Sequence, residues 1–125
     1  MEKIQLKPEV DIFDLLQVDP TILEMIAFTY EYCVQYNLPC TITSLMEEVD
    51  GRKFSTHSDG RACDFSARGF GDFHISRFQH MFREKFKGRG AFNSKGEDRP
   101  IVYHKVPGGV AHFHMQVRRR PKKYT

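Results

Sequence analysis

Two short segments of the chain concentrate side chains that can bind a metal ion. The first is Ser-Thr-His-Ser-Asp-Gly-Arg-Ala-Cys-Asp, residues 55–64, and the second is His-Phe-His, residues 112–114. Imidazole nitrogens and carboxylate oxygens are ligands that Zn²⁺ accepts. If the fold brings the two segments together, they predict metal chemistry.

The second segment has the alternation of a β-strand. Successive side chains of a strand point to opposite faces, so His112, His114 and Gln116 share one face and the apolar residues between them share the other. The apolar face is expected in the core. The imidazoles are therefore expected to face a cleft.

The first segment can bring two ligands together at a turn. A tight turn at Gly60 lets His57 and Asp64 converge, and one histidine of the pair His112 and His114 completes a set of three. Three nitrogen or oxygen ligands suit a zinc ion whose fourth position holds water, and zinc lowers the pKa of that water to roughly 7. The other histidine of the pair is then placed to move protons.

The same residues resemble a known family. Five residues match the S-x-H-x-x-G-x-A-x-D motif of the D-alanyl-D-alanine metallopeptidases: Ser55, His57, Gly60, Ala62 and Asp64. The His-x-His of residues 112–114 is similar to the motif of the wider superfamily, which includes lysostaphin-type enzymes, the Hedgehog signalling domain and phage endolysins. The resemblance covers most of residues 20–117.

The resemblance implies a zinc-dependent peptidase that hydrolyses an amide bond in bacterial peptidoglycan peptides, of endolysin or carboxypeptidase type. It implies that His57, Asp64 and His114 hold the Zn²⁺ cofactor. It also implies that His112 is the catalytic histidine and that Ser55 supports the metal loop.

Two further residues are candidates for substrate binding or support. Arg61 lies within the first segment, and His104 lies on the strand expected to pair with the His-x-His strand. A cross-strand neighbour on the same face can reach the same cleft.

Two alternative functions remain open from the sequence. Peptidases of this family often carry an acidic residue shortly before the final ligand, whereas Ala111 and Phe113 flank His112. This favours a catalytically weak or inactive module that keeps zinc and binds a protein or wall ligand.

The second alternative is a basic nucleic-acid-binding protein. Residues 51–125 hold 17 Lys and Arg against 6 Asp and Glu, although the net charge of the whole chain is only +3. Five of these cations lie in residues 118–125. A basic tail can bind nucleic acid or another anionic polymer, such as one of the cell wall, with strong salt dependence.

Periodicity and turn residues predict the elements that position these groups. We expect a helix over 20–36, a central half-buried strand within 40–46, a loop over 47–60, a strand over 61–66, a helix over 73–87, and a hairpin of 99–106 with 110–117. Asp19 and Pro20 begin the first helix, and Asn37 ends it. Asp72 is expected to cap the second helix.

These elements predict an α+β fold with a small antiparallel sheet and two main helices, and the resemblance implies the Hedgehog/D-Ala-D-Ala peptidase-like fold. The length of 125 residues predicts one domain, residues 1–117, followed by a basic tail, residues 118–125. The three cysteines lack a CxxC spacing and are expected to be reduced.

The sequence has no apolar stretch long enough for a membrane span and does not begin like a secretory signal. We therefore expect synthesis in the cytoplasm without a signal peptide. Action at the cell wall follows if the chain is an endolysin. The oligomeric state is not predicted.

Overall fold

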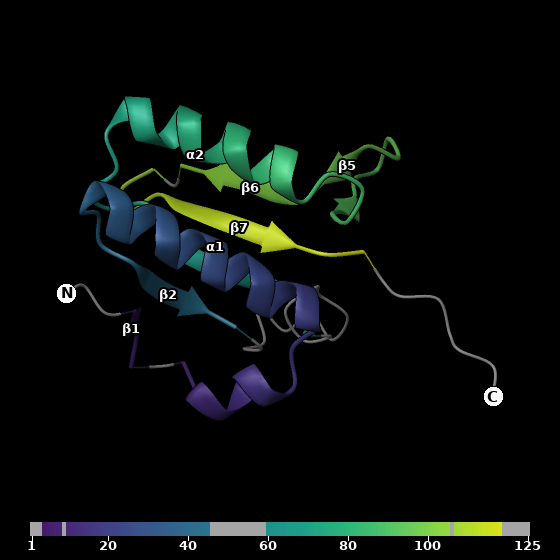
Figure 1. Ribbon diagram of the computed structural model, residues 1–125, viewed down its shortest axis with the longest axis horizontal. Helices are drawn as coiled ribbons and strands as arrows, with labels where there is room; N and C mark the ends of the chain where they lie inside the picture. Colours follow the sequence, from purple (N-terminus) through teal and green to yellow (C-terminus); the bar gives the residue numbers. More distant parts are fainter. Residues whose placement is uncertain (1–3, 9, 46–59, 106, 119–125) are drawn as a thin grey trace.

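The computed structural model describes residues 4–8, 10–45, 60–105 and 107–118, and it has an α+β fold (Figure 1). Along the chain the elements are β1 (Gln5–Leu6), the short 3-10 helix η1 (Ile12–Leu16), α1 (Pro20–Tyr36), β2 (Thr41–Ser44), β3 (Ala62–Ser66), α2 (Asp72–Lys85), β4 (Ala91–Phe92), β5 (Asp98–Arg99), β6 (Ile101–His104) and β7 (His112–Gln116). The predicted helices and main strands are therefore present.

The main sheet has five strands in the order β1-β2-β3-β7-β6. The β2–β3, β3–β7 and β6–β7 pairs are antiparallel, but β1 pairs in parallel with β2, with Gln5 opposite Thr41. The prediction of a purely antiparallel sheet was therefore wrong, because a strand of two residues is too short to show any alternation in the sequence. β2 is an inner strand, but the centre of the sheet is β3.

The first helix begins and ends where its capping residues predict. The side chain of Asp19 accepts a hydrogen bond of 2.8 Å from the backbone N–H of Thr21, and Pro20 opens the helix. Asn37 follows the last turn in the left-handed conformation, with φ of 55°. This residue satisfies the final carbonyls and turns the chain towards β2.

The second helix differs from its prediction at both ends. Its N-cap is Gly71 without a side-chain hydrogen bond, so the prediction that Asp72 caps it was wrong; Asp72 is the first helical residue. The helix ends at Lys85, two residues early, because Phe86 leaves the helical conformation. Asp72 lies in the first turn of the helix. Its negative charge there still interacts favourably with the helix dipole.

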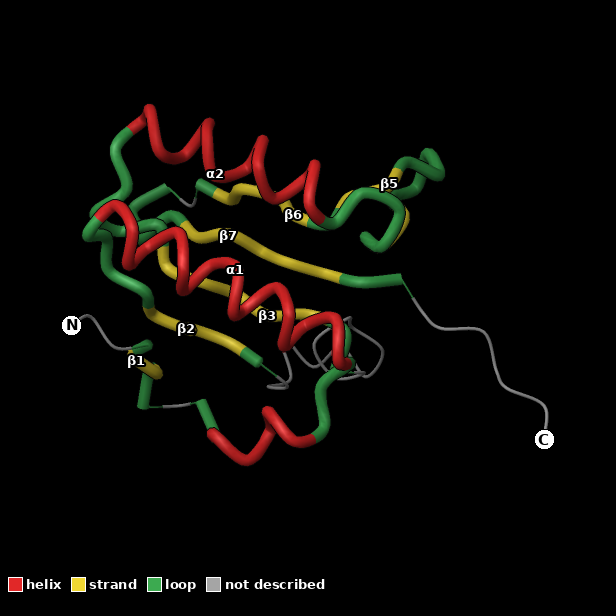
Figure 2. Tube along the Cα trace, viewed as in Figure 1, coloured by secondary structure: helices red, strands yellow, loops and turns green. Residues whose placement is uncertain are grey.

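Both helices lie on the same face of the sheet (Figures 1 and 2). The aromatic face of α2 is buried through Phe78 and Phe82, and Phe28 of α1 packs against both, with ring centroids 6.2 and 5.8 Å apart respectively. Phe113 of β7 meets Phe78 from the sheet side at 5.1 Å. The core therefore takes up one face of the sheet, and the opposite face is left for polar side chains.

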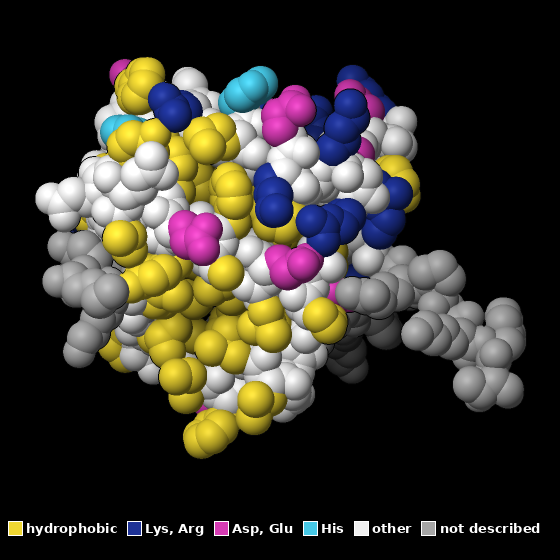
Figure 3. Space-filling model, in the orientation of Figure 1, with side chains coloured by type: hydrophobic (Ala, Val, Ile, Leu, Met, Phe, Trp, Pro, Cys, Tyr) yellow, Lys and Arg dark blue, Asp and Glu magenta, His cyan; other side chains and the backbone are white. Residues whose placement is uncertain are grey.

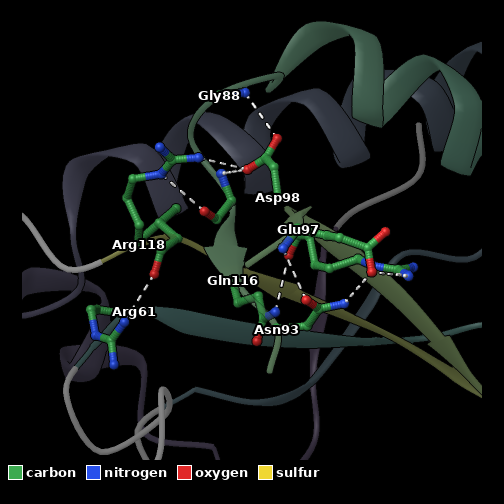
Figure 4. A network of polar contacts seen from close by, with 10 residues as sticks. Arg61, Gly88, Asn93, Glu97, Asp98, Gln116 and Arg118 are labelled. Carbon is green, nitrogen blue, oxygen red and sulfur yellow. Dashed lines mark hydrogen bonds and ion pairs between the residues drawn. The ribbon is translucent and has the colours of Figure 1, made fainter. Parts of the chain in front are cut away.

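A small second sheet, β4 with β5, was not predicted. The carboxylate of Asp98 organises it by accepting hydrogen bonds of 2.9 Å from the backbone of Gly88 and 2.8 Å from that of Gly90 (Figure 4). Arg118 also contacts Asp98, at 2.9 Å, and its guanidinium lies 4.2 Å above the ring of Phe92. The first residue of the predicted basic tail is thus held against the domain, and residues 119–125 lie outside the described residues.

On the helix side of the molecule, Lys and Arg side chains gather around the end of α2 and the small second sheet, while apolar side chains gather over α1 and η1 (Figure 3). Cys33, Cys40 and Cys63 are buried, and their thiols are not in disulfide bonds. Within the described parts of the chain, no helix combines the length and hydropathy needed to cross a membrane.

Candidate metal centre

The polar face of the sheet is built by the pairing of β3 with β7. This register places Asp64 directly opposite His114 and Ser66 directly opposite His112. The alternation predicted for the His-x-His strand is confirmed, since Phe113 is fully buried while both histidines are only partly buried. Residues that are 50 positions apart therefore share one surface.

Asp64 and His114 are in direct contact. Oδ1 of Asp64 lies 2.7 Å from Nδ1 of His114, and each side chain is 15% exposed. The pair is therefore mostly shielded from solvent but open on one side. An oxygen and a nitrogen donor at this separation can both reach one cation.

Gln116 fixes the orientation of the His114 ring. Its Nε2 donates to the carbonyl of Arg99 at 3.0 Å, which turns Oε1 towards Nε2 of His114 at 2.9 Å. Because Oε1 can only accept, Nε2 of His114 carries a proton, so a metal ion bound by this ring would be bound through Nδ1, the nitrogen that faces Asp64. Alternation placed Gln116 on this face, but its role depends on the position of Arg99 on β5, which the sequence did not predict.

Two more histidines lie on the same face. His104 is opposite His112 in the β6–β7 pair, with ring centroids 5.2 Å apart, and its ring is 6.1 Å from that of His114. Partial burial is the main cause that lowers the pKa of His104, and the neighbouring His112 and His114 lower it further while Asp64 opposes them. His104 is therefore neutral near pH 7.

The remaining predicted site residues are placed as follows. Nη1 of Arg61 donates to the carbonyl of Val117 at 3.2 Å, which ties the start of β3 to the end of β7 (Figure 4). His57 and Ser55 lie outside the described residues. Gly60, where the described chain resumes, has a φ of 69°, and its carbonyl accepts from the backbone N–H of Asp19 at 2.8 Å.

The side chains of this centre suit zinc in type. Asp64 and His114 supply an oxygen and a nitrogen donor, and Gln116 orients the imidazole as an outer hydrogen-bonding partner does in metal sites. The described residues do not by themselves contain a cluster of three or more His, Cys, Asp or Glu side chains arranged for a metal ion. The third predicted ligand, His57, lies outside them.

A bulge in β2 widens the polar face. Ile42 pairs with Phe65 and Ser44 pairs with Asp64, so β2 contains one residue more than β3 between these positions. Ile42 is buried in the core, while Ser44 lies beside Asp64 on the polar face. The register of β2 against β3 therefore shifts between Ile42 and Ser44.

Comparisons with protein-family models, curated proteins and solved structures find no significant match to this chain. The centre is therefore defined by its own geometry: a carboxylate and an imidazole in contact, an amide that orients the imidazole, and two further imidazoles on the same face.

Proposed function

We propose that the chain is a zinc-dependent peptidase that hydrolyses an amide bond in bacterial peptidoglycan peptides, with the fold of the Hedgehog and D-Ala-D-Ala peptidase domains. The observation that carries the proposal is the contact of Asp64 with His114, at 2.7 Å, with His112 two residues away on the same face. This is the convergence of the two sequence segments that a shared metal ion requires.

Three side chains would hold the zinc ion: His57, Asp64 and His114. When bound, zinc would supply a Lewis acid and lower the pKa of a water molecule to roughly 7. Gln116 accepts a hydrogen bond from Nε2 of His114, so Nδ1 is the nitrogen of this ring that would bind the zinc ion. The β3–β7 register brings Asp64, His114 and Gln116 to one face, and His57 lies outside the described residues.

His112 is the side chain that moves protons. An imidazole can take a proton from an attacking group and give one to the leaving amine nitrogen. His112 lies beside His104, whose lowered pKa keeps that neighbour neutral near pH 7. A neutral neighbour does not oppose a positive charge on His112 during proton transfer.

The proposal extends to place and partners. Peptidoglycan peptides are the substrates, and the protein acts at the cell wall. The basic residues 118–125 provide attachment to an anionic polymer.

The test combines zinc content with the release of fragments from purified peptidoglycan. Wild type is compared with His57→Ala, His112→Ala and the control His80→Ala, which removes an exposed histidine of α2. We expect about one zinc per chain and cleavage in wild type and control, loss of zinc in His57→Ala, and zinc without cleavage in His112→Ala.

Three other results would contradict the proposal. Zinc in wild type without cleavage of any muropeptide, together with tight binding of a protein or wall ligand, would identify a zinc-containing binding module. Absence of zinc would remove the metal centre altogether. Salt-dependent binding of nucleic acid that is lost on deleting residues 118–125 would identify a nucleic-acid-binding protein.

A further inference from the structure

Two of the three cysteines lie at the two ends of the short turn that joins α1 to β2 (Figure 2). Cys33 is in the last turn of α1, and Cys40 directly precedes β2. Only 1% of the surface of Cys33 and 2% of that of Cys40 are exposed. Both thiols are therefore buried beneath this turn.

The turn brings the two thiols together. Asn37 adopts the left-handed conformation, and the backbone N–H of Leu38 donates to the carbonyl of Cys33 at 2.8 Å. Sγ of Cys33 then lies 3.5 Å from the carbonyl oxygen of Pro39, the residue bonded to Cys40. The thiols of Cys33 and Cys40 are also hydrogen-bonded to each other. The two sulfur atoms are therefore neighbours.

Adjacent segments hold this turn in place. The backbone N–H of Gln5 on β1 donates to the carbonyl of Cys40 at 2.8 Å. A Cβ added to Gly69 would lie 2.9 Å from the ring of Pro39, so the turn also packs closely against the residues that follow β3. The proximity of the two thiols is therefore supported by backbone pairing and by packing.

The two thiols differ in acidity. Hydrogen bonding with Cys33 lowers the pKa of the Cys40 thiol, although burial opposes this shift. Hydrogen bonding with Cys40 and burial both raise the pKa of the Cys33 thiol. Because the thiolate is the reactive form of cysteine, Cys40 is the nucleophile of the pair.

We propose that Cys33 and Cys40 form a site of reversible oxidation, at which hydrogen peroxide converts the two thiols into a disulfide. The thiolate of Cys40 attacks the peroxide, so that an S–O bond forms, the O–O bond breaks and the leaving hydroxide takes up a proton. The sulfur of Cys33 then attacks the resulting sulfenic acid. The S–S bond forms, the S–O bond breaks, and the proton of Cys33 leaves with the hydroxide as water. The two thiols are oxidised to one disulfide, and one peroxide is reduced to two molecules of water.

This site lies behind one wall of a pocket. Pro39 and Thr41, the neighbours of Cys40, line a pocket of about 530 Å³ on the polar face of the sheet. A disulfide at Cys40 would join this wall covalently to α1. Other lining residues of the pocket are Lys7, Arg68 and His112. The inference goes beyond the proposed function and depends on neither zinc nor hydrolysis.

The test is peptide mapping of the full chain after treatment with hydrogen peroxide. Catalase removes the peroxide, and the remaining thiols are alkylated in denaturant. Chymotrypsin cleaves after Tyr36, between the two cysteines, so the peptides of Cys33 and Cys40 stay joined only through a disulfide. We expect mass spectrometry to find this joined pair, which separates on reduction, and to find Cys63 alkylated.

Urea denaturation measures the consequence of oxidation. The unfolding equilibrium constant of oxidised wild type is expected to be about 10- to 100-fold lower than that of reduced wild type, because a disulfide restricts the unfolded chain. The control Cys63→Ala keeps both thiols and is expected to show the same change. Cys40→Ala is expected to show no change and no joined peptides. Each variant is compared with its own reduced form, so destabilisation by the substitution itself does not affect the result.

Four results would overturn the inference. Three unmodified thiols after treatment of wild type would show that the folded pair does not react with peroxide. A disulfide that includes Cys63, or one between two chains, would show that the turn does not select this pair. Sulfinic acid at Cys40 beside an intact Cys33 thiol would show that Cys33 does not attack the oxidised sulfur. An equal gain of stability in Cys40→Ala would assign the effect to another oxidised residue.

Discussion

Oδ1 of Asp64 lies 2.7 Å from Nδ1 of His114, across two strands that pair directly in the centre of the sheet. The two residues stand 50 positions apart in the chain. Backbone pairing therefore sets their position, and neither depends on the end of a flexible loop. Side chains that are held by paired strands keep a more precise geometry than side chains on a loop.

The first prediction concerns the carboxylate of this pair. Asp64→Asn keeps the shape of the side chain but replaces the carboxylate, which is charged and has two oxygens, with a neutral amide that has one. Zinc content after dialysis is therefore expected to fall from about one per chain to near zero. Asp72→Asn, at the exposed start of α2, is the control and is expected to keep its zinc. Elemental analysis of both variants measures this, and full zinc content in Asp64→Asn would exclude Asp64 as a ligand.

The second prediction concerns the amide that orients His114. Gln116→Leu leaves Nε2 of His114 without its acceptor, and zinc affinity is expected to fall by about 10- to 100-fold. The control Gln79→Leu removes an amide whose hydrogen bonds, among the described residues, lie within α2, and it is expected to bind zinc like wild type. Competition with a chromophoric chelator gives the affinities. Equal affinities in both variants would show that Gln116 has no such role.

The third prediction separates metal binding from proton transfer. His112→Gln retains the three proposed ligands, so its zinc content is expected to equal that of wild type. Its turnover is expected to fall by about 10²- to 10⁴-fold, because general acid–base catalysis contributes about that much. Chromatography of released muropeptides measures turnover. If the rate stays within a few-fold of wild type, another group moves the proton.

The fourth prediction concerns the backbone conformation of Gly60, which lies shortly before β3. Gly60 and Gly96 both have positive φ, of 69° and 74°, so alanine at either position is expected to cost roughly 1–2 kcal/mol of unfolding free energy. At Gly60 the added Cβ would also lie 2.9 Å from the carbonyl oxygen of Gln17, which adds about 1–3 kcal/mol, whereas Gly96 has open space.

Urea denaturation of Gly60→Ala and Gly96→Ala, read by circular dichroism, gives the two free energies. The difference between them isolates the steric contact, because the backbone conformation is similar in both. If the two variants are equally destabilised, the contact with Gln17 relaxes freely and does not anchor the chain before β3.

The sequence was most informative where structure depends on near neighbours. The helix from Pro20 to Tyr36 matches its prediction because its capping residues, Asp19 and Asn37, are adjacent to it. The strand with His112 and His114 matches because alternation of polar and apolar residues is a property of the strand itself. The sequence predicted that Asp64 meets one histidine of the pair His112 and His114, the family resemblance implied His114, and the register places Asp64 opposite His114.

The sequence was least informative where structure depends on distant backbone. The parallel pairing of Gln5 with Thr41 and the bulge between Ile42 and Ser44 arise from hydrogen bonds to other strands, which leave no local pattern. The same holds for the pocket with Lys7 and Arg68, whose walls come from four separate segments. Proximity of this kind follows from topology and not from the spacing of residues.

The position of β7 between β3 and β6 also determines when the protein can fold during translation. β7 follows every other strand that the structure describes, so a nascent chain that ends before residue 112 contains β6 without its partner strand and Asp64 without His114. Strands that are far apart in the sequence pair slowly, because a long loop must close before their contacts stabilise the chain. The pairing of Asp64 with His114 therefore cannot form until β7 has left the ribosome.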